Sequence, residues 1–102
     1  MIIAEMNAGR KIDFQLIGNE LHLNDDEMVL DLEELQQEWD EHYTVFFDRK
    51  GRLTMNERQG RAYVIELDIP QMTWMRSEEN HDEIVRAPID LNTVTLTLWA
   101  VE

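Results

Sequence analysis

Apolar and polar residues alternate along several short stretches of this chain, which is the pattern of β-strands with one buried face. The clearest case is IDFQLIGNELHL, residues 12–23, where Gly-Asn separates two alternating segments. A two-residue turn there pairs Phe14 with Leu23 and Leu16 with Leu21. The pattern predicts a β-hairpin with these four side chains on one face. The opposite face would carry Asp13, Gln15 and His22.

More strands are predicted in the second half of the chain. TVFFDRKGRLTM, residues 44–55, is typical of a second hairpin around a glycine-containing loop. AYVIELDIP, residues 62–70, and NTVTLTLWAV, residues 92–101, also alternate. Their predicted apolar faces are formed by Tyr63, Ile65, Leu67 and Ile69 in the first and by Val94, Leu96 and Leu98 in the second. The charged stretch between them, RSEENHDE, is expected to form the tip of a long hairpin.

One amphipathic helix is predicted near residues 32–42. Asp31, with Glu34 three residues later, has the spacing of a helix N-cap and capping box. The apolar side chains that follow at helical spacing are Leu32, Leu35, Trp39 and Tyr43. These elements together predict an α+β fold, mostly antiparallel β. About six or seven strands would form a bent sheet or small barrel, and the helix would pack against it.

Length and composition indicate one folded domain over residues 1–102. The chain has 102 residues, 43% of them apolar, which is enough for a modest hydrophobic core. It has no cysteine, so disulfides and thiolate metal sites are excluded and packing must hold the fold together. The apolar run at the N-terminus, MII, is too short for a signal peptide or a membrane span, so a cytoplasmic protein is expected.

The net charge of −13 is unevenly distributed along the chain. Residues 12–48 contain twelve acidic residues and no lysine or arginine, whereas residues 49–61 contain five basic residues and one acidic residue. A charge of this sign repels nucleic acid and anionic membranes over most of the surface. We therefore expect no direct binding to nucleic acid and none to a membrane.

Catalytic motifs are absent from the sequence. Ser77 is the only serine, and no glycine-rich phosphate loop is present. Two histidines lie beside carboxylates, in WDEHY and NHDEI, and the metal ligands they could offer are His42 with Glu38, and His81 with Asp82. No HxH or HExxH pattern accompanies them, and chance neighbours are expected among 22 acidic residues. We expect a protein that is not an enzyme and has no cofactor and no metal. A protonated His42 would suit the last turn of the predicted helix.

Two surfaces are candidates for binding another protein. On the predicted helix, an acidic stripe would be formed by Asp31, Glu34, Glu38 and Glu41, and it would suit a basic partner. The segment QMTWMR, residues 71–76, and the last strand carry large apolar and arginine side chains, which interface cores favour. The candidates there are Met72, Trp74, Arg76 and Trp99.

The last predicted strand offers a third way to associate. If it lay at the edge of a sheet, its unpaired backbone groups would invite a strand of another copy, giving a homo-oligomer. The leading hypothesis is therefore a non-catalytic protein–protein interaction or assembly protein, of the size and composition of small phage or prophage structural and accessory proteins. One alternative is an acidic mimic of nucleic acid that inhibits a DNA- or RNA-binding protein. A second is a metal-dependent hydrolase.

Overall fold

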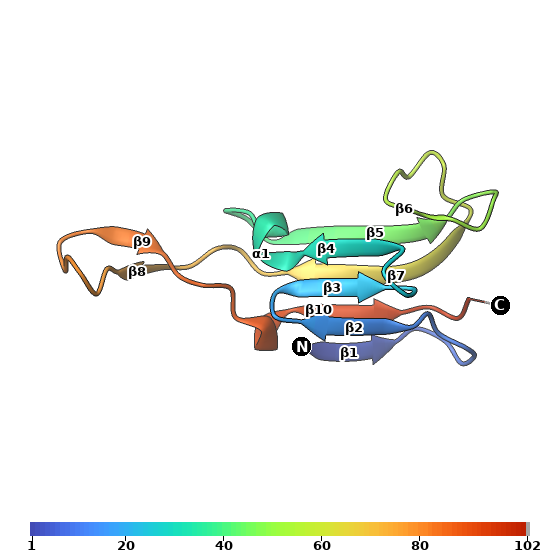
Figure 1. Ribbon diagram of the computed structural model, residues 1–102, viewed down its shortest axis with the longest axis horizontal. Coiled ribbons are helices and arrows are strands. Elements are labelled where there is room, and N and C mark those ends of the chain that lie inside the picture. The colour runs from blue at the N-terminus through green and yellow to red at the C-terminus, as the bar shows by residue number, and fades with distance from the viewer. Residues whose placement is uncertain (102) are drawn as a thin grey trace.

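A computed structural model describes residues 1–101 as two β-sheets that face each other, with a separate hairpin beyond one end of them (Figure 1). Most of the pairing is antiparallel. The elements are β1 (Ile2–Glu5), β2 (Phe14–Ile17), β3 (Glu20–Leu23), β4 (Met28–Asp31), α1 (Leu32–Leu35), β5 (Glu41–Phe47), β6 (Leu53–Thr54), β7 (Ala62–Ile69), β8 (Trp74–Arg76), β9 (Ile84–Arg86), the 3-10 turn η1 (Leu91–Thr93) and β10 (Thr95–Leu98).

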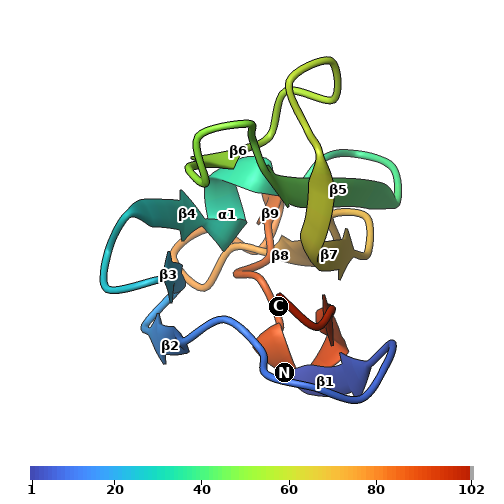
Figure 2. The same cartoon turned by 90° about the vertical axis from the view of Figure 1, so that its right-hand side faces the viewer.

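The larger sheet has five strands in the order β1-β10-β7-β5-β6, and the smaller has three in the order β2-β3-β4. Seen end on, the two sheets lie on opposite sides of the molecule (Figure 2). Neither sheet closes on itself, so the predicted small barrel is wrong, while the predicted mainly antiparallel character is confirmed. The count of about six or seven strands was too low, because residues 1–101 form ten strands in three sheets.

The first predicted hairpin is confirmed residue by residue. Phe14 pairs with Leu23 and Leu16 with Leu21, as the Gly-Asn turn requires. Gly18 in that turn has a φ of 58°, a left-handed conformation that glycine adopts without a steric penalty. Strand β4 then pairs with β3 and adds Leu30 to the same face, opposite Leu21.

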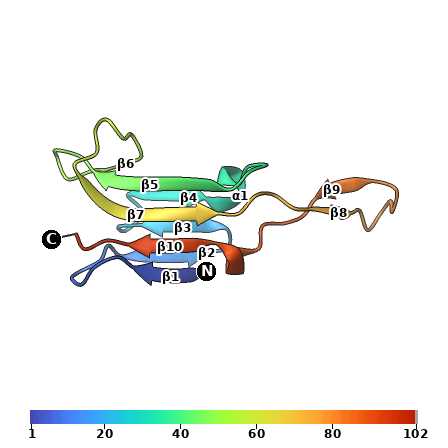
Figure 3. The same cartoon turned by 180° about the vertical axis from the view of Figure 1, so that it is seen from behind.

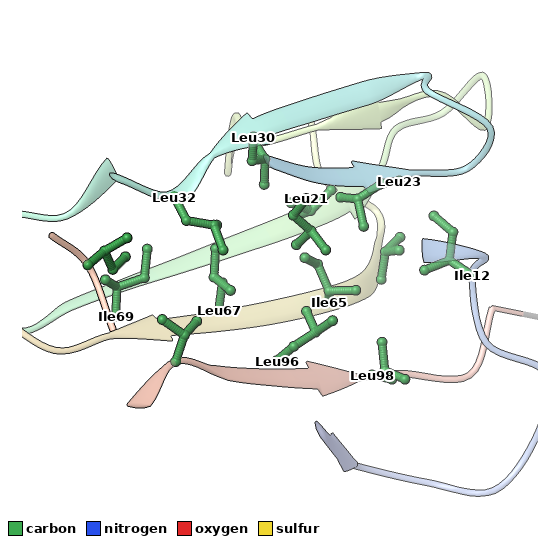
Figure 4. Close-up of a cluster of buried hydrophobic side chains, with 14 residues drawn as sticks. Ile12, Leu21, Leu23, Leu30, Leu32, Ile65, Leu67, Ile69, Leu96 and Leu98 are labelled. Atoms are coloured by element: carbon green, nitrogen blue, oxygen red, sulfur yellow. The ribbon is translucent and has the colours of Figure 1, made fainter. Parts of the chain in front are cut away.

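The hydrophobic core lies between the inner faces of the two sheets (Figure 4). Leu21, Leu23 and Leu30 point from the smaller sheet toward Ile65, Leu67 and Leu96 of the larger one (Figure 4). The buried apolar side chains are Ile12, Leu21, Leu23, Leu30, Leu32, Val45, Val64, Ile65, Leu67, Ile69, Ile89, Val94, Leu96 and Leu98. Removing this apolar surface from water is the main stabilising contribution to the fold.

The predicted helix begins where expected but is far shorter. The Asp31 carboxylate accepts hydrogen bonds from the backbone N–H groups of Glu33 and Glu34, at 3.1 and 3.2 Å, so the predicted N-cap is confirmed. The helix ends at Leu35, and Gln36 is already extended. The predicted range of 32–42 is wrong because Gln36 and Gln37 form hydrogen bonds with Pro70 and Met72 instead of continuing the helix.

The alternation in β7 is interrupted by a β-bulge. Val45 pairs with Ile65, but the next residue of β5, Phe46, pairs with Tyr63, so Val64 is the extra residue. Val64 and Ile65 are both buried, and Tyr63 turns to the outer face of the sheet. The prediction that Tyr63 shares the buried face of Ile65 is therefore wrong, because simple alternation does not continue through a bulge.

Strand β10 lies inside the larger sheet. It pairs antiparallel with β7 on one side and parallel with β1 on the other, with Ile3 opposite Leu96. The expectation that the last strand could offer a free edge is thus wrong for β10, and β1 and β6 form the edges of this sheet. Strand β1 was not predicted, since its few apolar residues show no alternation.

The molecule is elongated, with principal extents of 53, 25 and 21 Å. Seen from behind, the β8–β9 hairpin extends from the end of the sheets where α1 lies, and the loops around β6 lie at the other end (Figure 3). Within residues 1–101, the helices are too short to cross a membrane.

Candidate functional site

The β8–β9 hairpin stands away from the two sheets as an arm (Figures 1 and 3). We call residues 71–87 the arm. Three residue pairs hold its strands together, from Trp74 opposite Arg86 to Arg76 opposite Ile84. A two-stranded hairpin of this length is only marginally stable in water by itself. Its position must therefore depend on contacts at its base.

The base of the arm is attached to the segment that follows α1. Gln36, only 6% exposed, donates from Nε2 to the backbone oxygen of Pro70 at 3.0 Å. Arg86 donates from Nη2 to the backbone oxygen of Glu33 at 2.6 Å and to Oε1 of Gln36 at 3.0 Å. The backbone N–H of Met72 donates to the backbone oxygen of Gln37 at 2.8 Å. These bonds fix where the arm leaves the sheets.

The same contacts explain why the helix stops early. A buried amide costs free energy unless it is hydrogen-bonded, and Gln36 finds its partners in the arm rather than within a helix. Asp40 adds a further link, since its Oδ1 accepts a hydrogen bond from the backbone N–H of Gln71 at 2.8 Å. Residues 36–40 therefore act as the attachment site of the arm.

The arm presents apolar side chains to solvent. Trp74 is 56% exposed, Ile84 57% and Met75 40%. Tryptophan and methionine are enriched in the cores of protein interfaces, and apolar side chains gathered on one projecting element mark interaction surfaces. The arm is therefore the strongest candidate for a binding surface in residues 1–101.

Of the four predicted apolar and basic residues, three lie in the arm and Trp99 lies elsewhere. Trp74 and Arg76 are exposed on β8, and Met72 is half-buried at the base of the arm. Trp99 instead lies on the outer face of the larger sheet, where its ring stacks on Tyr63 at a centroid distance of 4.8 Å. Its Nε1 donates to Oε2 of Glu66 at 2.8 Å.

The predicted acidic stripe does not form, because its residues are not on one helix. Asp31 caps α1 and Glu34 is exposed within it. Glu38 is exposed in the segment after the helix. Glu41 belongs to β5 and accepts a hydrogen bond from Nε1 of Trp39 at 2.9 Å. The four carboxylates therefore do not follow one helix face, which was the predicted basis of the acidic stripe.

His42 lies on the outer face of the larger sheet rather than at a helix end. Its Nδ1 is 2.6 Å from Oδ1 of Asp68, and its Nε2 is 3.2 Å from Oε1 of Glu66. The hydrogen bond to Asp68, with the negative charges of both carboxylates, raises the pKa of His42 against the opposing effect of its partial burial. The predicted role for His42 at the helix C-terminus is therefore wrong.

A second histidine has the same kind of surroundings on the smaller sheet. Nδ1 of His22 is 2.7 Å from Oδ1 of Asp26, and Nε2 is 3.3 Å from Oε1 of Glu20. The hydrogen bond to Asp26 and the charge of Glu20 raise the pKa of His22. Sequence reasoning assigned no partner to His22. Asp26 lies at i,i+4 in a turn that the alternation pattern could not define.

The proposed metal ligands are not brought together. His42 is in β5 and Glu38 precedes it, whereas His81 and Asp82 lie in the loop that joins β8 to β9. Among residues 1–101, no three histidine, aspartate or glutamate side chains are arranged to hold a metal ion. A shallow depression of about 360 Å³ next to His42 is lined by Asp40, Glu41, His42, Asp68, Ile69, Pro70, Thr93 and Thr95.

Comparison of the whole chain with protein-family models, with curated proteins and with solved structures gives no match.

Proposed function

We propose that this chain is a non-catalytic protein–protein interaction or assembly protein that binds its partner through the β8–β9 arm. The observation that carries the proposal is the exposure of Trp74, Met75 and Ile84 on an element that has no hydrophobic core of its own. Exposed aromatic and aliphatic groups of this size lose contact with water when a partner covers them, which is the main driving force of association.

The attachment of the arm supports the same function. Gln36 and Arg86 hold its base through hydrogen bonds in a part-buried setting, so the arm is held in one direction before a partner arrives. Association costs less free energy when the binding element is already ordered. An arm fixed at its base and free at its tip is suited to reaching a neighbouring molecule.

The test is affinity capture from a lysate of the cells in which the chain is naturally made. The arm variant carries Trp74→Ser and Ile84→Ser. The matched control carries Ile17→Ser and Val29→Ser, two apolar side chains that are 51% and 44% exposed on the smaller sheet. We expect the wild-type chain and the control to retain the same partner at low salt and the arm variant to lose it, because Trp74 and Ile84 supply the apolar contact.

Two outcomes would contradict the proposal. Equal capture by the arm variant and the control would place the binding surface elsewhere. Equal capture of DNA- or RNA-binding proteins by all three chains, lost on a wash at about 0.5 M salt, would show a charge contact that does not use the arm, as expected of an acidic mimic. Circular dichroism and thermal unfolding of each variant verify that the fold of the two sheets is intact.

A further inference from the structure

The two ends of the long axis carry opposite charge. The tip of the arm, residues 77–83, lies at one extreme of the molecule, and the loops on either side of β6 lie at the other (Figures 1 and 3). The tip contains four acidic residues and no lysine or arginine, whereas residues 49–61 contain five basic residues and one acidic residue. Five of the nine lysine and arginine residues of a chain with a net charge of −13 are therefore concentrated at one end.

The basic end carries a shallow, open depression of about 330 Å³, which we call the basic socket. It is lined by Asp48, Arg49, Lys50, Arg52, Arg58, Gln59 and Arg61. The Asp48 carboxylate is bound within its own loop, because its Oδ1 accepts hydrogen bonds from the backbone N–H groups of Lys50 and Arg52 at 2.8 and 2.9 Å. Within residues 1–101, none of these five basic side chains makes an ion pair with a carboxylate of its own chain.

The acidic tip is shaped by hydrogen bonds from backbone N–H groups to the side chains of Ser77 and Asn80, and these bonds do not use the carboxylates. Ser77 Oγ accepts from the N–H of Glu79 and of Asn80, at 3.3 and 3.4 Å, and Oδ1 of Asn80 accepts from the N–H of Asp82 at 3.1 Å. The acidic side chains that the loop presents are Glu78, Glu79, Asp82 and Glu83, all exposed. In the described part of the chain they too have no ion-pair partner.

Apolar groups accompany the charges at both ends. Beside the acidic tip lie exposed Trp74 and Ile84. Beside the basic socket is a second depression of about 270 Å³, which shares Arg61 with the socket and is lined by Phe46, Glu57, Gly60, Arg61, Ala62 and Tyr63. Tyr63 is 48% exposed there, with its ring 5.3 Å from that of Phe46 between centroids. Each end therefore combines a charged site with an adjacent apolar site.

We infer that the partner of the arm is a second copy of this chain, bound head to tail, with the acidic tip of one copy in the basic socket of the next. The inference rests on the proposed function, since it uses the same arm. Arginine side chains bind carboxylates in charge-assisted hydrogen bonds, and Trp74 and Ile84 would pack against Phe46 and Tyr63.

End-to-end contact also suits the overall charge. Two copies with a net charge of −13 repel each other, but a contact between their ends keeps the acidic sheets apart along the longest axis, 53 Å in each molecule. At physiological salt, charges more than about 8 Å apart are largely screened. A nucleic-acid strand, by contrast, is repelled by a chain with a net charge of −13. A head-to-tail contact is heterologous, so it generates rings or filaments rather than closed two-fold dimers.

The experiment is a complementation test by sedimentation velocity. The tip variant carries Glu78→Lys and Glu79→Lys, and the socket variant carries Arg49→Glu and Arg58→Glu. These four side chains make no hydrogen bond within residues 1–101.

Wild-type chain is expected to self-associate at concentrations on the order of 100 μM, as weak contacts of small area do. Each variant alone is expected to remain monomeric. An equimolar mixture should form dimers and no larger species, because it retains one intact tip and one intact socket per pair.

A matched control shows whether net charge alone is responsible. Glu34→Lys with Glu38→Lys changes the net charge by the same amount as the tip variant, on exposed residues at neither site. We expect this control to associate as wild type does. The charge-neutral pair Glu78→Gln and Glu79→Gln provides a milder tip variant, with an intermediate loss, in case the reversed charges disturb the loop.

Several results would overturn the inference. They are a wild-type chain that stays monomeric, a mixture of tip and socket variants that does not associate, or a control that loses association as the tip variant does. Binding of an added oligonucleotide at the socket, without self-association, would equally reject it. If arm-dependent capture from the lysate persists while the chain is monomeric, the proposed function stands and only the identity of the partner is wrong.

Discussion

Arg86 and Gln36, which are fifty residues apart in the chain, share a hydrogen bond of 3.0 Å between Nη2 and Oε1. The same Nη2 donates to the backbone oxygen of Glu33 at 2.6 Å, and the Gln36 amide donates to the oxygen of Pro70. This relationship joins the base of the arm to the end of α1. The direction of the arm therefore depends on a residue that the helical pattern placed inside a longer helix.

Replacing Gln36 by leucine should loosen the arm. The substitution leaves Arg86 without its side-chain acceptor and the Pro70 oxygen without its Nε2 donor, and unpaired polar groups in such a setting cost about 1–3 kcal/mol. We expect faster hydrogen exchange in residues 71–87 and a lower free energy of unfolding. Gln37→Leu is the matched control, since the Gln37 amide makes only one long hydrogen bond, of 3.4 Å to the Leu35 oxygen. Equal exchange in both variants would show that Gln36 does not hold the arm.

The elements predicted correctly are those in which local chemistry decides the structure. The hairpin at 12–23 has alternation, turn residues and register that all agree, and Asp31 caps a helix through its immediate neighbours. The length of that helix depended instead on Pro70 and Arg86, which are distant in sequence. Tertiary contacts of this kind override helical periodicity.

The candidate sites were harder to predict because they depend on register between strands. Asp68 and Glu66 reach His42 only because β5 pairs antiparallel with β7, with His42 opposite Asp68. The bulge at Val64 moves Tyr63 to the outer face, next to Trp99. Neither fact is encoded in the residues beside those positions. The sequence marked Trp74 as a candidate surface residue but did not predict whether it is buried. Its exposure depends on the separation of the β8–β9 hairpin from the two larger sheets.

The stability of the chain should carry a pH-dependent contribution from His42. Its pKa in the folded chain is raised above the unfolded value of about 6.5. A raised histidine pKa stabilises the fold below about pH 6.5, and the contribution is lost as the pH rises through the folded pKa. His42 is about half exposed, so the effect should be only a few tenths of a kcal/mol.

NMR titration of the His42 ring is the direct measurement. Asp68→Asn removes the principal partner and should lower the titration midpoint toward about 6.5. Asp13→Asn, on an exposed residue outside the larger sheet, serves as the control and should leave the midpoint unchanged. A His42 midpoint that does not respond to Asp68→Asn would show that the short contact is not maintained in solution.

Gly60 should not tolerate a side chain. A Cβ at this position would overlap Cγ, Cδ1 and Cβ of Phe46, so Gly60→Ala must displace the ring that lines the depression beside the basic socket. Overpacking of this kind costs about 1–3 kcal/mol. Thermal unfolding measures the loss of stability. In a chain that already carries Phe46→Ala, the further change Gly60→Ala should cost much less, because Cγ and Cδ1 of the ring are gone. A Gly60→Ala variant as stable as wild type would contradict the packing of Phe46 against this loop.

Glu66 links two side chains on the outer face of the larger sheet, and this predicts a measurable coupling between them. Its Oε1 is 3.2 Å from Nε2 of His42, and its Oε2 accepts a hydrogen bond of 2.8 Å from Nε1 of Trp99. Trp99→Phe keeps a ring stacked on Tyr63 but removes the donor, so the carboxylate is held less firmly beside His42. A double-mutant cycle of His42→Gln and Trp99→Phe should therefore show non-additivity of about 0.5 kcal/mol.

The coupling should also depend on pH, because only protonated His42 attracts Glu66 strongly. Non-additivity is expected at about pH 6, with the double variant less destabilised than the sum of the single variants. It should vanish at a pH well above the raised pKa of His42, where the ring is neutral. His22→Gln combined with Trp99→Phe provides the control, since His22 lies on the other sheet and distant sites add independently. Coupling of equal size in the control, or at both pH values, would mean that the substitutions destabilise the fold in general and are not coupled by the Glu66 carboxylate.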